Sequence, residues 1–389
     1  MASVEIRPVQ SKRDLKRFVK VPFRLHRDHP QWVPPLIFER MEFLNRKKNP
    51  WFEHGEAEYF VAERDGELVG RITAQTDELW DETQGGSDAM FGFFETIDDS
   101  GVAAALLDAA TGWAASRGRT RILGPMDFTT NDEVGILIDG YELRPMILEN
   151  WHPPFYKTLL EAHGFGKAMD LLMWELELGR LKEGEEFDPA IHAAAEKALR
   201  EEGVTIRNID KGNLAREMRL FTPVYNDAWS DNWGFVPATD AEIEFHAKNL
   251  KQVLNEDWAY IAEKDGEAIG AALTLPDVNQ VMAKLGGRLL PFGWLRFLLG
   301  RRRIDRLRVL ALGVKRDYHH SGVAAGLYLK HLETAGKPGA IEGGEMGWIL
   351  ETNEAMNRAM KGMGGEVVKK YRIYEKAIQS GSHHGRGST

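Results

Sequence analysis

The stretch Phe60-Val61-Ala62-Glu63-Arg64-Asp65-Gly66-Glu67-Leu68-Val69-Gly70 returns later in the chain as Tyr260-Ile261-Ala262-Glu263-Lys264-Asp265-Gly266-Glu267-Ala268-Ile269-Gly270. In both copies two apolar runs flank an Asp-Gly pair, which suits a tight turn with positive φ, so each copy is predicted to form a β-hairpin. The pentapeptide Ser-Gly-Val-Ala-Ala is also repeated, at 100–104 and at 321–325. Each time it joins an apolar, strand-like run to an alanine- and leucine-rich helical stretch.

Two shorter echoes follow in the same order, Ile147-Leu148-Glu149-Asn150 with Ile349-Leu350-Glu351-Thr352-Asn353, and Gly164-Phe165 with Gly364-Gly365. These ordered matches predict an α/β protein with two tandem copies of one fold, each a mixed central sheet flanked by helices. We expect a first domain over residues 1–180, a polar linker over 181–189 and a second domain over 190–378. Residues 379–389 are expected to be a disordered tail or an expression remnant.

Local signals place individual elements within the second copy. Thr239 and Glu242 resemble a capping box that opens a helix. Leu307–Val314 is predicted to be a buried strand. Val367–Lys376 is expected to supply the closing pair of strands.

Composition narrows the class of protein. The 389 residues suffice for two domains with their own cores, and the absence of cysteine excludes disulfides and thiolate chemistry. The first residues lack the layout of a signal peptide, and no apolar run approaches the ~20 residues of a membrane-spanning helix, so we expect a cytoplasmic protein. A net charge of −9 argues against nucleic-acid binding. The pair His26 and His29 lacks a third ligand, so no metal site is expected.

The two pentapeptides differ in their charged neighbours. A glycine-led junction from strand to helix exposes backbone N–H groups, which favours an anion at the helix N-terminus. The second junction has positive residues nearby and His319 and His320 directly before it, where the first has Asp98 and Asp99. Each carboxylate near a surface would repel a pyrophosphate by about 1 kcal/mol or more. We therefore expect an anion site in the second copy alone, although the aspartates could equally be there to cap a helix.

The segment from Leu312 to Ala324 resembles the acyl-CoA site of the GNAT superfamily of N-acyltransferases. That signature is a strand, then Arg or Gln, two residues, Gly, one residue, and Gly or Ala. His319, Gly322 and Ala324 fill these positions, with His319 replacing the usual Arg or Gln. The resemblance implies that strand residues bind the pantetheine arm and turn amides bind the CoA pyrophosphate. The residues so implied are Leu312, Gly313, Val314, His319, His320, Ser321, Gly322, Val323, Ala324 and, after the next strand, Asn353.

The whole chain is similar to tandem GNAT proteins, a group that includes bacterial ceramide synthases of the GNAT type. The similarity is carried by the segments at 131–135, 225–237 and 291–294. It implies an acyl-CoA-dependent N-acyltransferase that transfers a long-chain acyl group to a hydrophobic amine. The most specific acceptor that it implies is a sphingoid base. Met360 stands where the family often carries a tyrosine general acid. Two alternatives therefore stay open: an acetyltransferase for a small amine, and a non-catalytic protein that binds acyl-CoA or a partner.

Residues 285–303 combine apolar and aromatic side chains with a cluster of arginines. This pattern is typical of an element that touches a membrane surface, and it also suits a lid over an acyl chain. The alternative is a helix that packs on the first domain with its arginines in solvent.

An N-acyltransferase needs a carboxylate or an ordered water to accept the proton of the amine. Glu345 is our first candidate for this catalytic base and Glu351 the second, although charged strand residues usually face solvent. Tyr225, Trp229 and Trp233 are candidate walls of an acceptor pocket, or else core residues. Asn131, Asp132 and Glu133 are candidate ligands of the acceptor's polar head, or else turn formers.

Overall fold

The computed structural model describes residues 3–178, 189–335 and 341–379. The linker expected at 181–189 and the tail expected at 379–389 fall almost entirely outside these residues. We call residues 3–178 copy one and residues 189–379 copy two.

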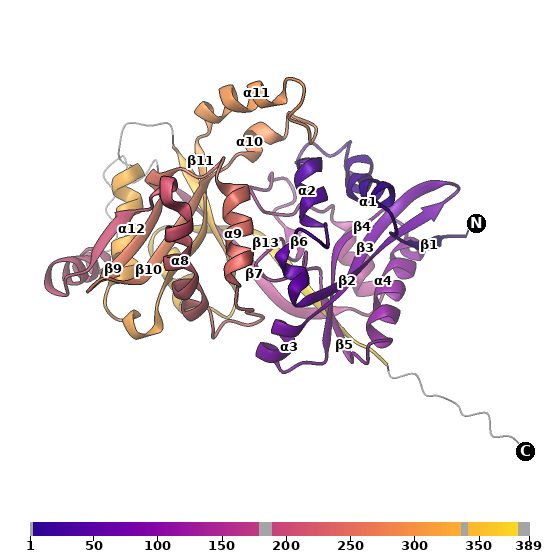
Figure 1. Cartoon of the computed structure of the whole chain (residues 1–389), viewed down its shortest axis with the longest axis horizontal. Helices are drawn as coiled ribbons and strands as arrows, with labels where there is room; N and C mark the ends of the chain where they lie inside the picture. The colour runs from indigo at the N-terminus through magenta and orange to yellow at the C-terminus, as the bar shows by residue number, and fades with distance from the viewer. Residues whose placement is uncertain (1–2, 179–188, 336–340, 380–389) are drawn as a thin grey trace, which may run out of the picture.

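The described residues form one mixed sheet with helices on both of its faces (Figure 1). The strands are β1 (Glu5–Pro8), β2 (Gly55–Arg64), β3 (Glu67–Asp77), β4 (Asp88–Thr96), β5 (Arg121–Gly124), β6 (Ile136–Asp139), β7 (Gly166–Glu177), β8 (Thr205–Asn208), β9 (Ala259–Lys264), β10 (Glu267–Pro276), β11 (Arg306–Val314), β12 (Gly343–Leu350) and β13 (Glu366–Ala377). The α-helices are α1 (Lys12–Leu25), α2 (Ile37–Phe43), α3 (Glu78–Gln84), α4 (Ser100–Ala115), α5 (Phe155–Ala162), α7 (Pro189–Glu196), α8 (Leu214–Ala228), α9 (Asp240–Leu250), α10 (Asn279–Met282), α11 (Gly293–Gly300), α12 (Val323–Ala335) and α13 (Glu354–Gly362).

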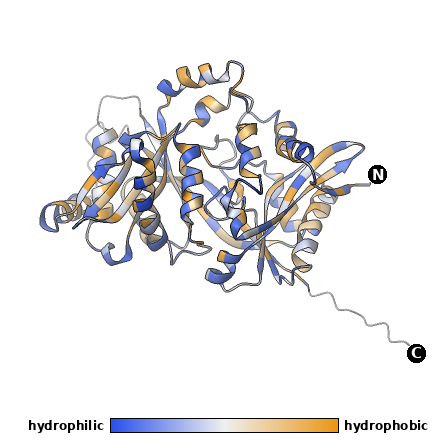
Figure 2. Cartoon of the chain, in the orientation of Figure 1, coloured by the Kyte–Doolittle hydropathy of each residue, from blue (hydrophilic) through white to orange (hydrophobic). Residues whose placement is uncertain are grey.

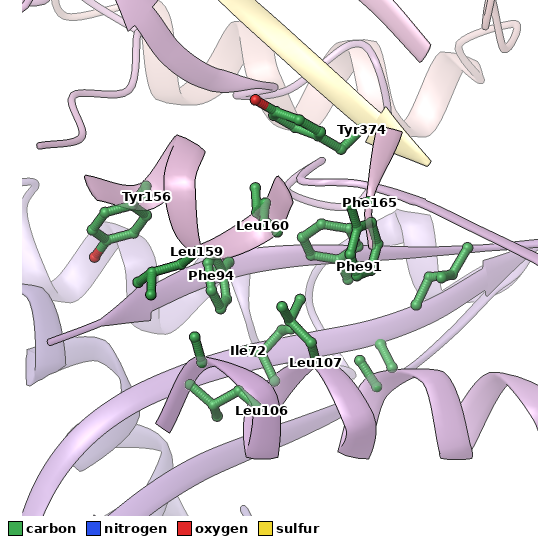
Figure 3. Close-up of a cluster of buried hydrophobic side chains, with 14 of the residues drawn as sticks. Ile72, Phe91, Phe94, Leu106, Leu107, Tyr156, Leu159, Leu160, Phe165 and Tyr374 are labelled. Atoms are coloured by element: carbon green, nitrogen blue, oxygen red, sulfur yellow. The ribbon is translucent and has the colours of Figure 1, made fainter. Parts of the chain in front are cut away.

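The order of the strands reveals an exchange between the copies. It runs β1-β2-β3-β4-β5-β13-β7-β12-β11-β10-β9-β8, so the last strand of each copy lies beside the other copy's sheet. At the centre β7 and β13 pair antiparallel, with Leu171 opposite Tyr371. Figure 3 shows the result in the core of copy one, where Tyr374 of β13 joins Leu160 and Phe165.

The prediction of two strands at Val367–Lys376 is wrong. β13 is a single strand of 12 residues. The physical reason is that this segment contains no glycine, proline or asparagine that would favour a turn.

The predicted hairpins are confirmed. Asp65 and Gly66 have φ values of 53° and 80°, and their counterparts Asp265 and Gly266 have 51° and 84°. Two successive positive φ angles define the type I′ turn, which matches the twist of the flanking strands. The capping box at Thr239 is also present, and it opens α9.

Different helices cover the two faces of the sheet in copy two. Val323 and Leu327 of α12 pack on one face, which we call the α12 face. The helix α13 lies on this same face, because its Met360 packs with Tyr328 of α12. On the other side Val224 of α8 packs with residues of α10, and we call this the α8 face.

Candidate active site

The parallel strands β11 and β12 separate in the middle of copy two. Their pairing starts at Arg306–Gly343 and ends at Val309–Met346, and we call the point beyond this last pair the fork. Successive strand residues point to opposite faces. Val309 and Met346 therefore face the apolar cluster under α12 and α13, whereas Arg308 and Glu345 face the other side.

A buried cluster of charges lies at the fork on the α8 face. The Lys369 Nζ lies 2.5 Å from Glu345 Oε1 and 3.0 Å from Glu149 Oε2. Arg308 Nε lies 3.5 Å from Glu149 Oε1, and the Arg308 guanidinium also donates to the carbonyl of Gly347 at 3.2 Å. The exposed fraction of these four charged side chains is at most 5%. The cluster joins both copies, because Glu149 belongs to copy one.

Burial and charge shift the pKa values within this cluster. Burial and the neighbouring Glu149 carboxylate raise the pKa of Glu345 to about 7, against the opposing effect of Lys369. Burial also opposes ionisation of Glu149, but the charges of Lys369 and Arg308 outweigh it and lower the pKa of that carboxyl. Glu345 Oε2 is buried and accepts no hydrogen bond from the described residues. A carboxylate with a free oxygen and a pKa near neutrality is suited to accept a proton.

An apolar pocket lies at the fork on the α12 face. Its empty space is about 620 Å³ when the open solvent at its mouth is counted, and Leu307, Val309 and Met346 form part of its strand wall. Tyr328 and Leu332 of α12 line the opposite side. Glu345 also belongs to the strand wall of this pocket, while its carboxylate binds Lys369 on the α8 face.

The second pentapeptide forms the start of α12, at the open end of the fork. Gly322 has a φ of +78°, and a Cβ there would lie 2.0 Å from the carbonyl oxygen of Ala194 in α7. Both the turn and the close approach of α7 therefore require glycine. His319 Nε2 lies 2.9 Å from the Val314 carbonyl oxygen, which ties the turn to the end of β11. Ser321 bonds the Tyr318 carbonyl at 2.6 Å.

The equivalent junction in copy one is closed by its own side chain. The Asp99 carboxylate accepts hydrogen bonds from the amides of Gly101 and Val102 at 2.9 and 3.0 Å, and Arg64 pairs with it at 2.8 Å. These interactions fill the position that an anion would take at the N-terminus of α4.

The strand amides of copy one are also occupied. The Phe93 amide donates to Asp127 at 2.7 Å, and the Thr96 amide donates to the Tyr156 hydroxyl at 2.9 Å. In copy two no described side chain accepts a hydrogen bond from the amides of Leu310–Val314. Among the described residues, copy two therefore lacks side chains that bind its strand amides as Asp127 and Tyr156 do in copy one.

Three of the candidate acceptor residues meet beside β11. The Tyr225 hydroxyl donates to the Asn131 side-chain oxygen at 2.6 Å, across the boundary between the copies. Tyr225 stacks on Trp229 with ring centroids 4.8 Å apart. A Cβ on Gly313 would lie 2.4 Å from the Trp229 ring, so this ring covers the strand directly.

The other candidates bind or pack against different residues, although Asp132 lies close enough to Tyr225 for its charge to raise the pKa of that hydroxyl. Asp132 is buried near His246, and burial and the Glu242 and Asp127 charges raise its pKa well above the usual range. Glu133 forms an ion pair with Arg40 of copy one. Trp233 packs on the apolar cluster that contains Val236.

Glu351 and Asn353 already have protein partners beyond the end of β12. Glu351 is an ion-pair partner of Lys167 at 2.6 Å and lies at the surface. The Asn353 side chain accepts from the Met356 amide at 3.1 Å and caps α13.

Sequence reasoning missed the partners of Glu345. Lys369 lies beside Lys370 in a strand that carries several other charged residues, whereas Arg308 lies between the apolar residues Leu307 and Val309. Glu149 lies in the repeated Ile-Leu-Glu-Asn motif. Only for Arg308 was there a local signal, a charged residue between two apolar strand residues.

Comparison with known proteins gives the family. A model described as the acetyltransferase (GNAT) family matches residues 24–131. A bacterial ceramide synthase of Caulobacter vibrioides is 38% identical over 385 residues, covering 97% of this chain and 98% of that protein. The chain belongs to the GNAT family. Protein YghO of Escherichia coli is also 38% identical to this GNAT protein, over 96% of its length and 95% of YghO.

Solved structures agree on the fold. A tandem GNAT protein from the clavulanic acid biosynthesis pathway has a TM-score of 0.56 at 13% identity, covering 97% of this chain and 99% of that one. A GCN5-related N-acetyltransferase from Sphaerobacter thermophilus has a TM-score of 0.52 at 12% identity, covering 97% and 96%. These likenesses confirm the predicted tandem GNAT fold. The family model matches a part of copy one. Copy one therefore retains the family's sequence pattern, although Asp99 caps the N-terminus of its helix α4.

Two further observations concern the described residues alone. None of their helices is both long and apolar enough to span a membrane. They contain no group of three or more His, Cys, Asp or Glu side chains placed to hold a metal ion.

Proposed function

We propose that this N-acyltransferase transfers a long-chain acyl group from acyl-CoA to the amine of a sphingoid base, and that the reaction takes place at the fork of copy two. The observation that carries this proposal is the position of Glu345, a buried carboxylate with a free oxygen beside the open strand edge of β11. The full-length similarity to a bacterial ceramide synthase supports the choice of acceptor.

The chemistry assigns a role to each part of the fork. The amides that open α12, at Val323 and Ala324, hold the CoA pyrophosphate, and the edge of Leu312–Val314 aligns the pantetheine arm. The amine nitrogen attacks the thioester carbonyl carbon, and free strand amides stabilise the oxyanion that forms. Glu345 accepts the proton of the amine as the C–N bond forms. The C–S bond then breaks, and the CoA thiolate takes a proton from water, because Met360 cannot donate one.

The acceptor approaches from the α8 face in this scheme. Asn131 and Tyr225 hold its polar head, and Trp229 forms an apolar wall beside them. Asp132 lies next to this group and can pair with a second polar substituent. Glu351 remains the alternative base.

The repeated pentapeptide offers a matched test of the CoA site. Ser321→Asp adds a negative charge at the helix N-terminus of copy two, and Ser100→Asp adds the same charge in copy one. We expect Ser321→Asp to raise the dissociation constant for palmitoyl-CoA about tenfold, since ~1 kcal/mol or more acts on each charge pair. Ser100→Asp should leave it unchanged. The reverse pattern would show that copy one binds CoA and would refute the assignment.

Substrate class is tested by the choice of donor and acceptor. With palmitoyl-CoA and sphinganine we expect release of free CoA and formation of an N-acylated product, seen by mass spectrometry. Turnover of acetyl-CoA with small amines in place of this reaction would favour the acetyltransferase alternative. Tight binding of palmitoyl-CoA without turnover of any amine would favour the non-catalytic alternative.

We further propose that α11 and its flanks touch a membrane surface, where a hydrophobic acceptor would be found. The exposed fraction is 77% for Leu290, 71% for Phe292 and 60% for Leu299, and the arginines 301–303 follow directly. Figure 2 shows apolar residues along α11, which projects from the rest of the molecule. Apolar side chains beside a basic cluster are typical of elements that bind anionic lipid surfaces.

A further inference from the structure

We propose that the apolar pocket on the α12 face holds the hydrocarbon tail of the acyl-CoA, and that Leu332 helps to set the chain length. This inference rests on the proposed function, because it assumes a thioester at the fork.

The position of the pocket connects it to the reacting carbonyl. Val309 and Met346, the last paired residues before the fork, both line the pocket. From there the pocket continues toward Leu307 at the start of β11 and Ala335 at the end of α12. The strand rises about 3.3 Å per residue, so the segment from Leu312 to Leu307 spans roughly 16 Å. A tail whose thioester carbonyl lies near Leu312 would pass the fork and reach the pocket at Val309 and Leu307 within this length.

Three polar side chains of the pocket, those of Thr274, Tyr328 and His331, already have hydrogen-bond partners. The Thr274 hydroxyl and His331 Nε2 lie 2.9 Å apart, and His331 Nδ1 lies 2.8 Å from the Leu327 carbonyl oxygen. The Tyr328 hydroxyl donates to the Met356 sulfur at 3.2 Å. The polar head of a substrate would find few free hydrogen-bond partners in this pocket. A hydrocarbon tail, in contrast, would gain roughly fourfold in binding constant for each methylene that it buries.

The two faces of the fork distinguish the donor from the acceptor. Glu345 and Lys369 lie on the α8 face, so the amine and the chain attached to it belong on that side. The pocket lies on the α12 face, on the same side as the helix that would bind the CoA pyrophosphate. The tail in the pocket is therefore that of the acyl donor.

Substitutions of Leu332 test this inference, because a larger side chain there narrows the pocket and a smaller one widens it. Leu332→Trp should lower kcat/KM for palmitoyl-CoA at least about tenfold and leave the value for octanoyl-CoA within about twofold. Leu332→Ala should shift the preferred donor toward longer chains. The control is Leu329→Trp, at a position on the same helix that does not line the pocket. Thermal unfolding of each variant checks that it is folded.

Binding separates this inference from the proposed function. Wild-type protein should bind palmitoyl-CoA more tightly than CoA, and Leu332→Trp should abolish that difference without weakening CoA. If this holds while no amine is acylated, the pocket assignment stands and the proposed function fails. If Leu332→Trp changes the preferred chain length of the sphingoid base, or affects all donors equally, the pocket assignment is overturned.

Discussion

The ammonium group of Lys369 lies 2.5 Å from the carboxylate of Glu345, and the two residues come from strands on opposite sides of β7. Lys369 also contacts Glu149 of copy one at 3.0 Å. The candidate base is thus held by a cation on the exchanged strand and faced by a carboxylate from the other copy. Its ionisation depends on the correct assembly of both copies.

Replacing Glu345 with glutamine removes the proposed base and keeps the shape of the side chain. We expect kcat to fall about 100-fold or more, because general-base catalysis contributes on this scale. In the wild type only the ionised carboxylate accepts a proton, so the rate should rise with pH through about 7. This limb of the pH–rate profile should be absent in the residual activity of the variant.

Glu354→Gln serves as the control, since Glu354 is exposed in the first turn of α13. Glu351→Gln separates the two candidate bases. If Glu345→Gln is fully active and Glu351→Gln is inactive, Glu351 is the general base and the assignment to Glu345 is wrong.

Lys369→Met should be strongly destabilising. It leaves two buried carboxylates without their shared cation, which costs about 3–5 kcal/mol in the free energy of unfolding. Adding Glu149→Gln should recover part of this loss because one unpaired charge is removed. Urea denaturation measures both effects. Lys370→Met, one residue further along β13, should change stability by less than about 0.5 kcal/mol; an equal loss there would contradict the role of the buried cluster.

His54 of copy one links Asp77 to Glu242 of copy two. Burial alone would lower the pKa of His54, but its hydrogen bond to Asp77 and its ion pair with Glu242 outweigh burial and raise the pKa to about 10. The folded pKa exceeds the unfolded value of about 6.5, so this stabilisation is complete below pH ~6.5 and disappears as the pH rises through 10.

We therefore expect His54→Ala to lower the free energy of unfolding by at least about 1 kcal/mol near pH 6, after allowance for solvent screening. The difference from wild type should shrink steadily toward pH 10. His163→Ala removes a histidine–aspartate pair with Asp108 that is confined to copy one, and it should have little effect. A loss for His54→Ala that does not vary with pH would rule out the ion pair as its cause.

The exposed apolar residues around α11 predict binding to anionic vesicles. The double variant Leu290→Glu with Leu299→Glu should reduce the fraction that sediments with phosphatidylglycerol vesicles several-fold. Binding of the wild type should also weaken with salt, since each arginine near the surface contributes about 1 kcal/mol. Leu199→Glu changes an exposed leucine outside this segment and should sediment like wild type. Equal sedimentation of all three proteins would exclude α11 as the contact.

Local sequence signals predicted the local structure of this chain. The Asp-Gly hairpins at 65–66 and 265–266 and the capping box at Thr239 follow from residues close together in sequence. The exchange of β7 and β13 could not be predicted in the same way, because no residues close in sequence specify which of the two sheets a closing strand joins. The choice depends on contacts such as Tyr374 in the core of copy one, which are distant in sequence.

The repeated pentapeptide made one difference between the two copies predictable. The comparison of the two pentapeptides pointed to Asp99 as the difference, and the structure shows its carboxylate at the N-terminus of α4. Lys369 and Glu149 could not be assigned to Glu345 from sequence, because the contact joins three distant segments. Asn353 illustrates the opposite case, since an asparagine that fits a binding motif also fits a helix cap.

The position of β13 has a consequence for synthesis of the protein on the ribosome. The first half of the polypeptide emerges without the strand that lies beside β5 and β7, and this strand consists of residues 366–377. Until residues 366–377 have been synthesised, an unpaired strand edge stays open in the nascent chain, and such edges promote misassociation. Deletion of these residues would therefore damage the sheet of copy one as much as that of copy two.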